Sequence, residues 1–84
     1  MKKGYVAIDD YEVIAAGVDE EAVKAWVFDF VVKDYDQTEI DEILADLDYQ
    51  NLDDLRMDMV YRGFPDFWDY LGIDFEEAAI IGAD

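Results

Sequence analysis

Charge is the feature that most constrains how this chain can fold, because 23 of its 84 residues are Asp or Glu and only 6 are Lys or Arg. The net charge of −17 opposes compaction through self-repulsion. Chains with such an excess are disordered when apolar residues are scarce. Here 25 residues are Leu, Ile, Val or Phe, which is above the roughly 20% that marks disordered chains. We therefore expect one folded domain over residues 1–84, with an apolar core and an acidic surface.

The side-chain types that the chain lacks exclude several kinds of chemistry. There is no Cys, His or Ser, which excludes disulfides, Cys/His zinc sites and Ser–His or Cys–His catalysis. Without serine there is also no attachment point for the prosthetic arm of an acyl carrier. With 23 acidic residues, close carboxylate pairs arise by chance, so they do not indicate acid–base catalysis. We predict that the protein is not an enzyme.

One acidic stretch begins like a calcium-binding loop. Asp34, Asp36 and Thr38 stand at alternate positions, as the first ligands of an EF-hand do. The glycine expected at the sixth position is Glu39, and the glutamate expected at the twelfth is Ala45. Both the sharp turn and the bidentate ligand are missing. We predict no metal site and no other cofactor.

The sequence has no pattern typical of a membrane protein or of a nucleic-acid-binding protein. No apolar run approaches the 18 residues of a membrane span, and the short run after Lys3 ends at Asp9, too early for a signal peptide. Direct phosphate contacts need clustered Lys and Arg, and a field this negative would repel DNA. We expect a cytoplasmic protein with a basic protein as its partner; its oligomeric state stays open.

Capping residues predict the helices. Asp19 followed by two glutamates predicts the start of a helix, and Asp36 has capping-box spacing with Glu39. A third helix is expected from Asn51, and a short aromatic helix is expected from Pro65 or Asp66 to Gly72. The apolar positions expected to face the core of the first three helices are Val23, Trp26, Val27, Phe30 and Val31, then Ile40, Ile43, Leu44 and Leu47, then Leu52, Leu55 and Met59.

The remaining segments decide the fold class. Residues 4–8 look extended, residues 11–16 are expected to form a short helix closed by Gly17, and Asp74 is expected to cap a last helix. Residues 27–32 are rich in β-branched and aromatic side chains and could instead form a strand. We predict a mostly α domain of four to six short helices, with at most one or two short strands; a small α+β domain is the alternative.

The acidic segment, residues 34–58, is the first candidate for a partner-binding surface. It has ten carboxylates and Arg56 as its only base, so it carries −9. Carboxylates three or four residues apart on a helix have Cβ atoms about 5–6 Å apart, a spacing comparable to that of phosphates along a nucleic-acid strand. Like charges at this spacing destabilise a helix, and a mixed-sign surface would give solubility at less cost. The candidate contact residues are Asp34, Asp36, Glu39, Asp41, Glu42, Asp46, Asp48, Asp53, Asp54 and Asp58.

The aromatic segment, residues 64–70, is the second candidate surface. Its aromatic side chains stand next to acidic ones, and two interpretations are open. One is that these rings anchor the core while their neighbours are solvated. The other is that Trp and Tyr inside an acidic rim form a hot spot against a basic groove. The residues of that candidate hot spot are Phe67, Trp68 and Tyr70.

In composition the whole chain resembles the DNA-mimic proteins that phages and mobile elements use against host defence, such as anti-restriction and anti-CRISPR proteins. Residues 5–12, YVAIDDYE, resemble the "AIHDYE"-like stretch of ArdA-type antirestriction proteins, with Asp9 in place of His. Residues 74–78, DFEEA, resemble their acidic "FEDAY"-like stretch. The resemblance implies that ordered carboxylates occupy the nucleic-acid groove of a host enzyme.

Three functions follow from these patterns. The first is an inhibitor that mimics nucleic acid and blocks the basic surface of a nuclease or a CRISPR effector. The second is an antitoxin or immunity protein that neutralises one basic nuclease. The third is a halophilic or purely structural acidic domain. The thirteen aromatic and seven Ile residues argue against it, because they supply an apolar core that does not need salt.

Overall fold

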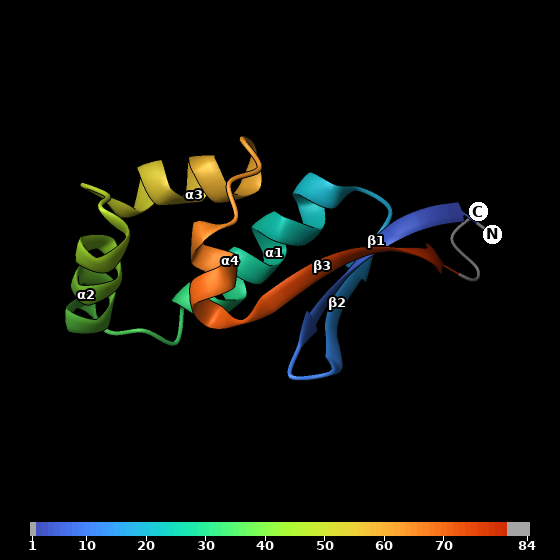
Figure 1. Ribbon diagram of the computed structural model, residues 1–84, viewed down its shortest axis with the longest axis horizontal. Helices are drawn as coiled ribbons and strands as arrows, with labels where there is room; N and C mark the ends of the chain where they lie inside the picture. The colour runs from blue at the N-terminus through green and yellow to red at the C-terminus, as the bar shows by residue number, and fades with distance from the viewer. Residues whose placement is uncertain (1, 81–84) are drawn as a thin grey trace.

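A three-stranded antiparallel sheet and four helices make up residues 2–80, the residues that the computed structural model describes (Figure 1). The strand order is β2-β1-β3, so β1 is the central strand. The molecule is elongated, 42 × 24 × 18 Å, with the sheet at one end and α2 at the other (Figure 1). The elements in chain order are β1 (Lys2–Asp9), β2 (Glu12–Gly17), α1 (Glu20–Val32), α2 (Gln37–Leu47), α3 (Leu52–Val60), α4 (Asp66–Leu71) and β3 (Ile73–Ile80).

The prediction of a mostly α domain is wrong, and the alternative of a small α+β domain is correct. Residues 11–16, expected as a helix, belong to the hairpin turn and β2, and Asp74 lies within β3 instead of capping a helix. The physical reason is non-local pairing, because β1 pairs with β3 from Lys2↔Ile80 to Asp9↔Ile73. Local patterns do not reveal hydrogen bonds between segments so distant in sequence. Residues 4–8 are extended as predicted, and residues 27–32 are helical.

The predicted starts of α1, α2 and α3 are confirmed at the level of single hydrogen bonds. The side chain of Asp36 accepts from the backbone N–H of Glu39 at 2.8 Å, and Asp19 and Asn51 cap α1 and α3 in the same way. Gly72 ends α4 with a φ of 75°, a left-handed conformation that glycine adopts without strain. Gly17, expected to close a short helix, instead ends β2.

The β1–β2 hairpin turns on Asp10 and Tyr11, whose φ angles are 51° and 68°. Two-residue hairpins of type I′ require positive φ at both positions, and Asn-Gly is the usual pair there. Here neither residue is glycine; Asp tolerates the left-handed conformation better than most residues, so the strain falls mainly on Tyr11. The side chain of Tyr11 is 99% exposed, and the hairpin projects away from the helices (Figure 1).

The core lies where the helices meet one another and the sheet. Phe28 and Phe67 are both fully buried, with ring centroids 5.2 Å apart, and the Trp68 ring packs edge-on against Phe75 of β3 at 4.7 Å. The apolar face predicted for α1 is partly wrong. The structure buries Val23, Val27 and Phe28 and leaves Trp26 and Phe30 exposed, because α1 turns these two rings away from the aromatic core.

Candidate partner-binding surface

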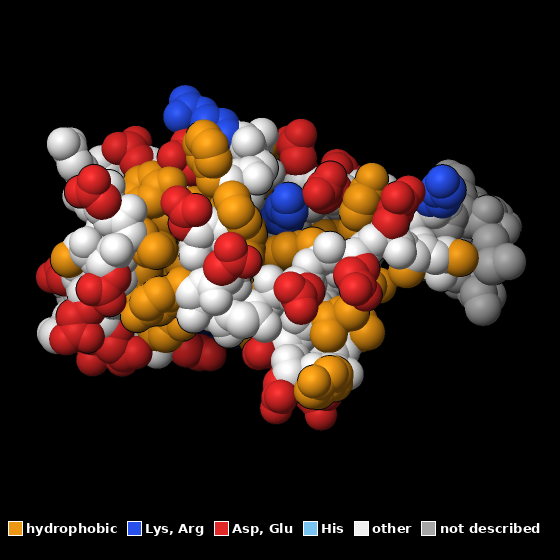
Figure 2. Space-filling view, viewed as in Figure 1, with side chains coloured by type: hydrophobic (Ala, Val, Ile, Leu, Met, Phe, Trp, Pro, Cys, Tyr) orange, Lys and Arg blue, Asp and Glu red, His pale blue; other side chains and the backbone are white. Residues whose placement is uncertain are grey.

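The carboxylates of the acidic segment lie on α2, α3 and the loops beside α2, at the end of the molecule away from the sheet. Figure 2 shows acidic side chains gathered over α2. Nine of the ten candidate acids are exposed, and only Asp58 is partly buried. The two helices therefore bring these acids together on one end of the molecule.

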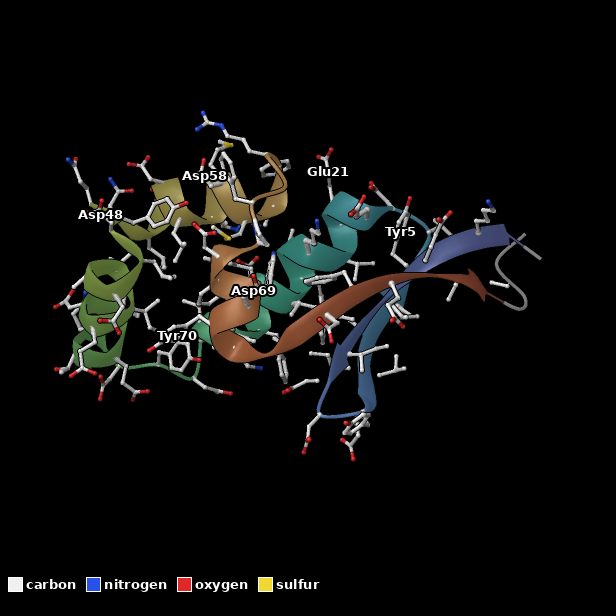
Figure 3. All side chains as sticks on the ribbon, in the orientation of Figure 1. Tyr5, Glu21, Asp48, Asp58, Asp69 and Tyr70 are labelled. Carbon is white, nitrogen blue, oxygen red and sulfur yellow. The ribbon has the colours of Figure 1, made fainter. Side chains whose placement is uncertain are left out.

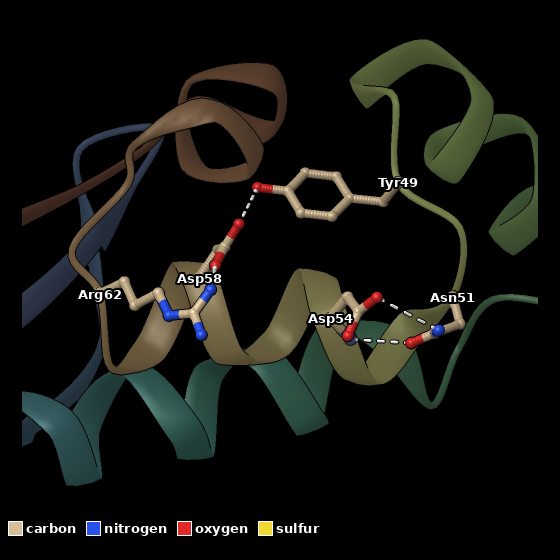
Figure 4. Close-up of polar contacts among 5 residues, drawn as sticks. All are labelled: Tyr49, Asn51, Asp54, Asp58 and Arg62. Carbon is tan, nitrogen blue, oxygen red and sulfur yellow. Dashed lines mark hydrogen bonds and ion pairs between the residues drawn. The ribbon is translucent and has the colours of Figure 1, made fainter.

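Hydrogen bonds hold part of this surface in place. Asp41 on α2 accepts from the side-chain amide of Gln37 at 2.9 Å. Asp54 on α3 receives a bond from the Asn51 side-chain nitrogen at 3.3 Å, in addition to the cap that Asn51 provides (Figure 4). Both carboxylates are exposed to solvent although they accept these hydrogen bonds. A pre-ordered charged group loses less conformational entropy when a partner binds.

A shallow pocket of about 320 Å³ lies at the corner between α2 and α3. Asp48, Asp54 and Asp58 line it together with Tyr49 and Arg62 (Figures 3 and 4). Asp48 ends α2 in a left-handed conformation with a φ of 63°, which Asp tolerates better than most residues. The pocket is polar and lined by more carboxylates than cations, so a guanidinium or an ammonium group suits it chemically.

Asp58 has two partners inside this corner. It accepts from the Tyr49 hydroxyl at 2.8 Å and from Arg62 Nη1 at 2.9 Å (Figure 4). Burial of the phenol, together with this hydrogen bond, raises the pKa of Tyr49 to about 12. Tyr49 is therefore protonated at neutral pH and donates to Asp58. The structure places Asp58 as the acid that connects the loop after α2 to α3, and it leaves the other nine candidate acids facing solvent.

Arg56, the only base of the acidic segment, is turned away from it. Its Nε and Nη2 atoms donate to the two carboxylate oxygens of Asp29 at 3.0 and 3.2 Å, which joins α3 to α1. This bidentate contact raises the pKa of Arg56 further. The acidic surface on α2 and α3 is thus not neutralised by its own arginine.

The other described Lys and Arg side chains also lie against carboxylates or rings. Lys3 is 3.7 Å from Glu77, and Lys24 is 3.1 Å from Glu20. Lys33 lies over the Phe30 ring at 4.6 Å. With Arg62 bound to Asp58, every basic side chain whose position is described, from Lys3 onward, has such a contact.

The aromatic segment divides between core and surface. Phe67 is fully buried and Trp68 is 4% exposed, and the Trp68 indole N–H donates to the Met59 carbonyl at 3.3 Å. A partner cannot reach these two rings, so the core interpretation applies to them and they are removed from the candidate hot spot. Tyr70 is half exposed and projects from α4 toward α2, where its hydroxyl lies 3.5 Å from Asp46 (Figure 3).

Sequence reasoning missed a pair of exposed rings on α1. Trp26 and Phe30 stack with centroids 5.1 Å apart and planes 10° apart. Their spacing of four residues places them on one stripe of the helix, but the same spacing also fits a core face. The neighbouring Phe28 was the sequence signal that Trp26 and Phe30 are exposed, because a helix face that buries Phe28 is rotated away from Trp26.

No protein-family model matches the sequence, and neither curated proteins nor solved structures give a significant match. Among residues 2–80, no helix is both long and apolar enough to cross a membrane. The candidate site is therefore argued from its own geometry and charge.

Proposed function

We propose that this protein is a non-enzymatic inhibitor that presents the carboxylates of α2 and α3 to the basic nucleic-acid-binding surface of another protein. The observation that carries the proposal is that nine exposed acids share one end of the molecule, while the arginine of the same segment faces Asp29. The proposed target is a nuclease or a CRISPR effector of a host defence system. The proposed place of action is the host cytoplasm, with the gene carried by a phage or a mobile element.

Electrostatics supports this class of partner. A surface that carries one sign of charge attracts an oppositely charged cleft over distances longer than a contact, which speeds association. The field falls off within a Debye length of about 8 Å at physiological salt, so association slows as salt is added. Held carboxylates such as Asp41 and Asp54 can then replace phosphates one by one at the Lys and Arg side chains of the cleft.

The proposal is tested by capture from host lysate with two matched triple variants of the full chain. One variant changes the helix surface, E39Q/E42Q/D53N. The other changes exposed acids near the sheet, D9N/D74N/E76Q. Both lower the negative charge by three. We expect the unchanged protein and the sheet variant to capture a basic nucleic-acid-binding protein. The helix variant should bind that protein at least tenfold more weakly, which corresponds to about 1.4 kcal/mol of binding free energy.

Competition with duplex DNA completes the test. Excess duplex should displace the captured protein, because both ligands would occupy one cleft. Retention of the partner in excess duplex would contradict mimicry and favour an antitoxin or immunity protein that binds away from the active site. Equal losses in the two triple variants would contradict the assignment to α2 and α3.

A further inference from the structure

A second surface lies at the other end of the molecule, along the outer edge of β2. The strand order places β2 at an edge of the sheet, so within residues 2–80 one side of its backbone is unpaired. A groove of about 430 Å³ runs between this strand and the first half of α1. Its lining is mostly apolar and includes Ile14, Val18, Ala22, Val23 and Trp26, with Asp19 as its one ionisable residue.

The two edges of the sheet differ in how they are protected. Edge strands that remain unpaired are usually blocked by charged side chains. Edge strand β3 carries Asp74, Glu76 and Glu77. By contrast, β2 reads EVIAAG and has a single charge, Glu12, at its start. The β2 edge is thus the one that can accept another strand.

Local geometry shapes the groove. The register between β1 and β2 shifts so that Ala7 pairs with Ala15 and Ile8 with Val13, which leaves Ile14 as the extra residue of a β-bulge. At the end of β2, Gly17 approaches α1 so closely that an added Cβ would lie 2.9 Å from Val23. This close approach sets the floor of the groove. Val18 and Trp26 are about half exposed at its border.

Charge identifies the occupant. Asp10 and Glu12 are exposed at the start of β2, and Asp19 and Glu21 are exposed just beyond its end. Lys24, the base on the same half of α1, is directed instead to Glu20 and the Phe75 ring of β3. A second copy of this chain would bring another −17 to the same edge, which like-charge repulsion opposes. An extended segment with basic residues has the complementary charge.

We propose that β2 accepts an extended segment of a basic partner protein as a fourth strand. In such strand addition, main-chain hydrogen bonds give affinity and side-chain pockets give specificity. Alternate apolar side chains of the segment fill the groove beside Trp26, and its Lys or Arg side chains reach the acids at both ends of β2. This docking site does not rest on the proposed mimicry, because it lies at the other end of the molecule.

The probe for this site is a peptide of alternating lysine and valine, acetyl-KVKVKV-amide, added to the ¹⁵N-labelled full chain. We expect amide shifts at residues 13–18 and at Ala22, a shift of the Trp26 indole signal, and slower hydrogen exchange along β2. A peptide of the same composition but with the order KKKVVV should bind at least tenfold more weakly, because it cannot place its valines on one side of a strand.

Two variants of equal charge locate the binding. Ala22 lines the groove and Ala45 lies on α2, and both are exposed helix positions. We expect A22K to weaken peptide binding at least tenfold and A45K to change it less than twofold. Unchanged amide signals outside residues 12–26 of A22K show that the variant is folded.

Three results would overturn the proposal. The first is equal binding of KVKVKV and KKKVVV, and the second is a set of shifts confined to α2 and α3. The third is sedimentation as a dimer that A22K abolishes, because a second copy would then fill the groove. None of these results depends on the lysate experiment, so failure here and failure of the mimic proposal are distinguishable.

Discussion

At the residue scale, Tyr49 shows how one hydrogen bond links a surface acid to the fold. Its hydroxyl donates to Asp58, which also binds Arg62, and the three residues lie at the corner of α2 and α3 (Figure 4). The sequence identified Asp58 as one acid among ten. It could not distinguish Asp58 as the one partly buried acid of the ten, because its contact with Tyr49 depends on how the loop after α2 folds back.

Replacing Tyr49 with Phe should lower the free energy of unfolding by about 1 kcal/mol at pH 8, through loss of this hydrogen bond. In the unchanged protein the pKa of Tyr49 is raised from 10.0 to about 12, so folding favours the protonated phenol. Its contribution to stability is therefore complete below pH 10 and is lost as the pH rises toward 12. Urea unfolding at a series of pH values measures this.

The control for this prediction is Tyr11→Phe, because the Tyr11 side chain is 99% exposed. Y11F should leave the free energy of unfolding unchanged at pH 8 and should show the same decrease in that free energy above pH 10 as the unchanged protein. Y49F should show a shallower decline than the unchanged protein. Identical pH profiles for Y49F and the unchanged protein would refute the role assigned to Tyr49.

At the scale of elements, the helices were predictable and two of the strands were not. A cap such as Asp36 works through atoms three residues apart, so the sequence contains all of its determinants. The strands β2 and β3 form by pairing with β1, and this pairing is not visible in their local sequence. In addition, an acidic residue after a turn, such as Asp74, resembles the start of a helix. The alternation of Ile73, Asp74, Phe75 and Glu76 was an available period-two signal for β3.

The same distinction applies to the candidate site. Predicting α2 and α3 was enough to give the separation of acids within each helix, because it follows from their spacing along the helix. The position of the two helices relative to one another depends on packing, so only the structure shows that these acids share one end of the molecule. The aromatic residues could not be assigned in this way. Phe67 and Trp68 are core residues while Tyr70 is exposed, and the three are nearly adjacent in sequence, so only packing against Phe28 and Phe75 separates them.

The hairpin turn gives a prediction at this scale. Replacing Asp10-Tyr11 with Asn-Gly should raise the free energy of unfolding by about 1–2 kcal/mol, because glycine removes the steric cost of a left-handed residue. Chemical denaturation measures the change. Tyr11→Ala is the matched control, because alanine retains a Cβ at the same φ and should give no comparable gain. Destabilisation by Asn-Gly would show that the Tyr11 side chain contributes contacts to the fold.

At the scale of the whole molecule, a net charge of −17 acts against an apolar core that includes Phe28, Leu55 and Phe67. Self-repulsion decreases when salt screens the charges, whereas burial of apolar surface does not require salt. The balance between the two determines whether the fold depends on its solvent.

We expect a far-UV circular dichroism spectrum with helix and strand signals in dilute buffer at pH 7. Adding about 0.3 M NaCl should raise the midpoint of thermal unfolding, because the Debye length then becomes shorter than the separation of most surface carboxylates. A chain that is unfolded in dilute buffer and folds only in molar salt would contradict this and favour the halophilic interpretation.

The arrangement of the basic side chains has a consequence for the solvent. Because Arg56 and Arg62 are held by Asp29 and Asp58, most exposed carboxylates on α2 and α3 are balanced by sodium or potassium ions that gather around the molecule. A basic partner that docks there displaces these ions into bulk water, as proteins do when they bind DNA. The resulting gain in ion entropy makes the logarithm of the binding constant fall linearly with the logarithm of the salt concentration, and the slope counts the ions released.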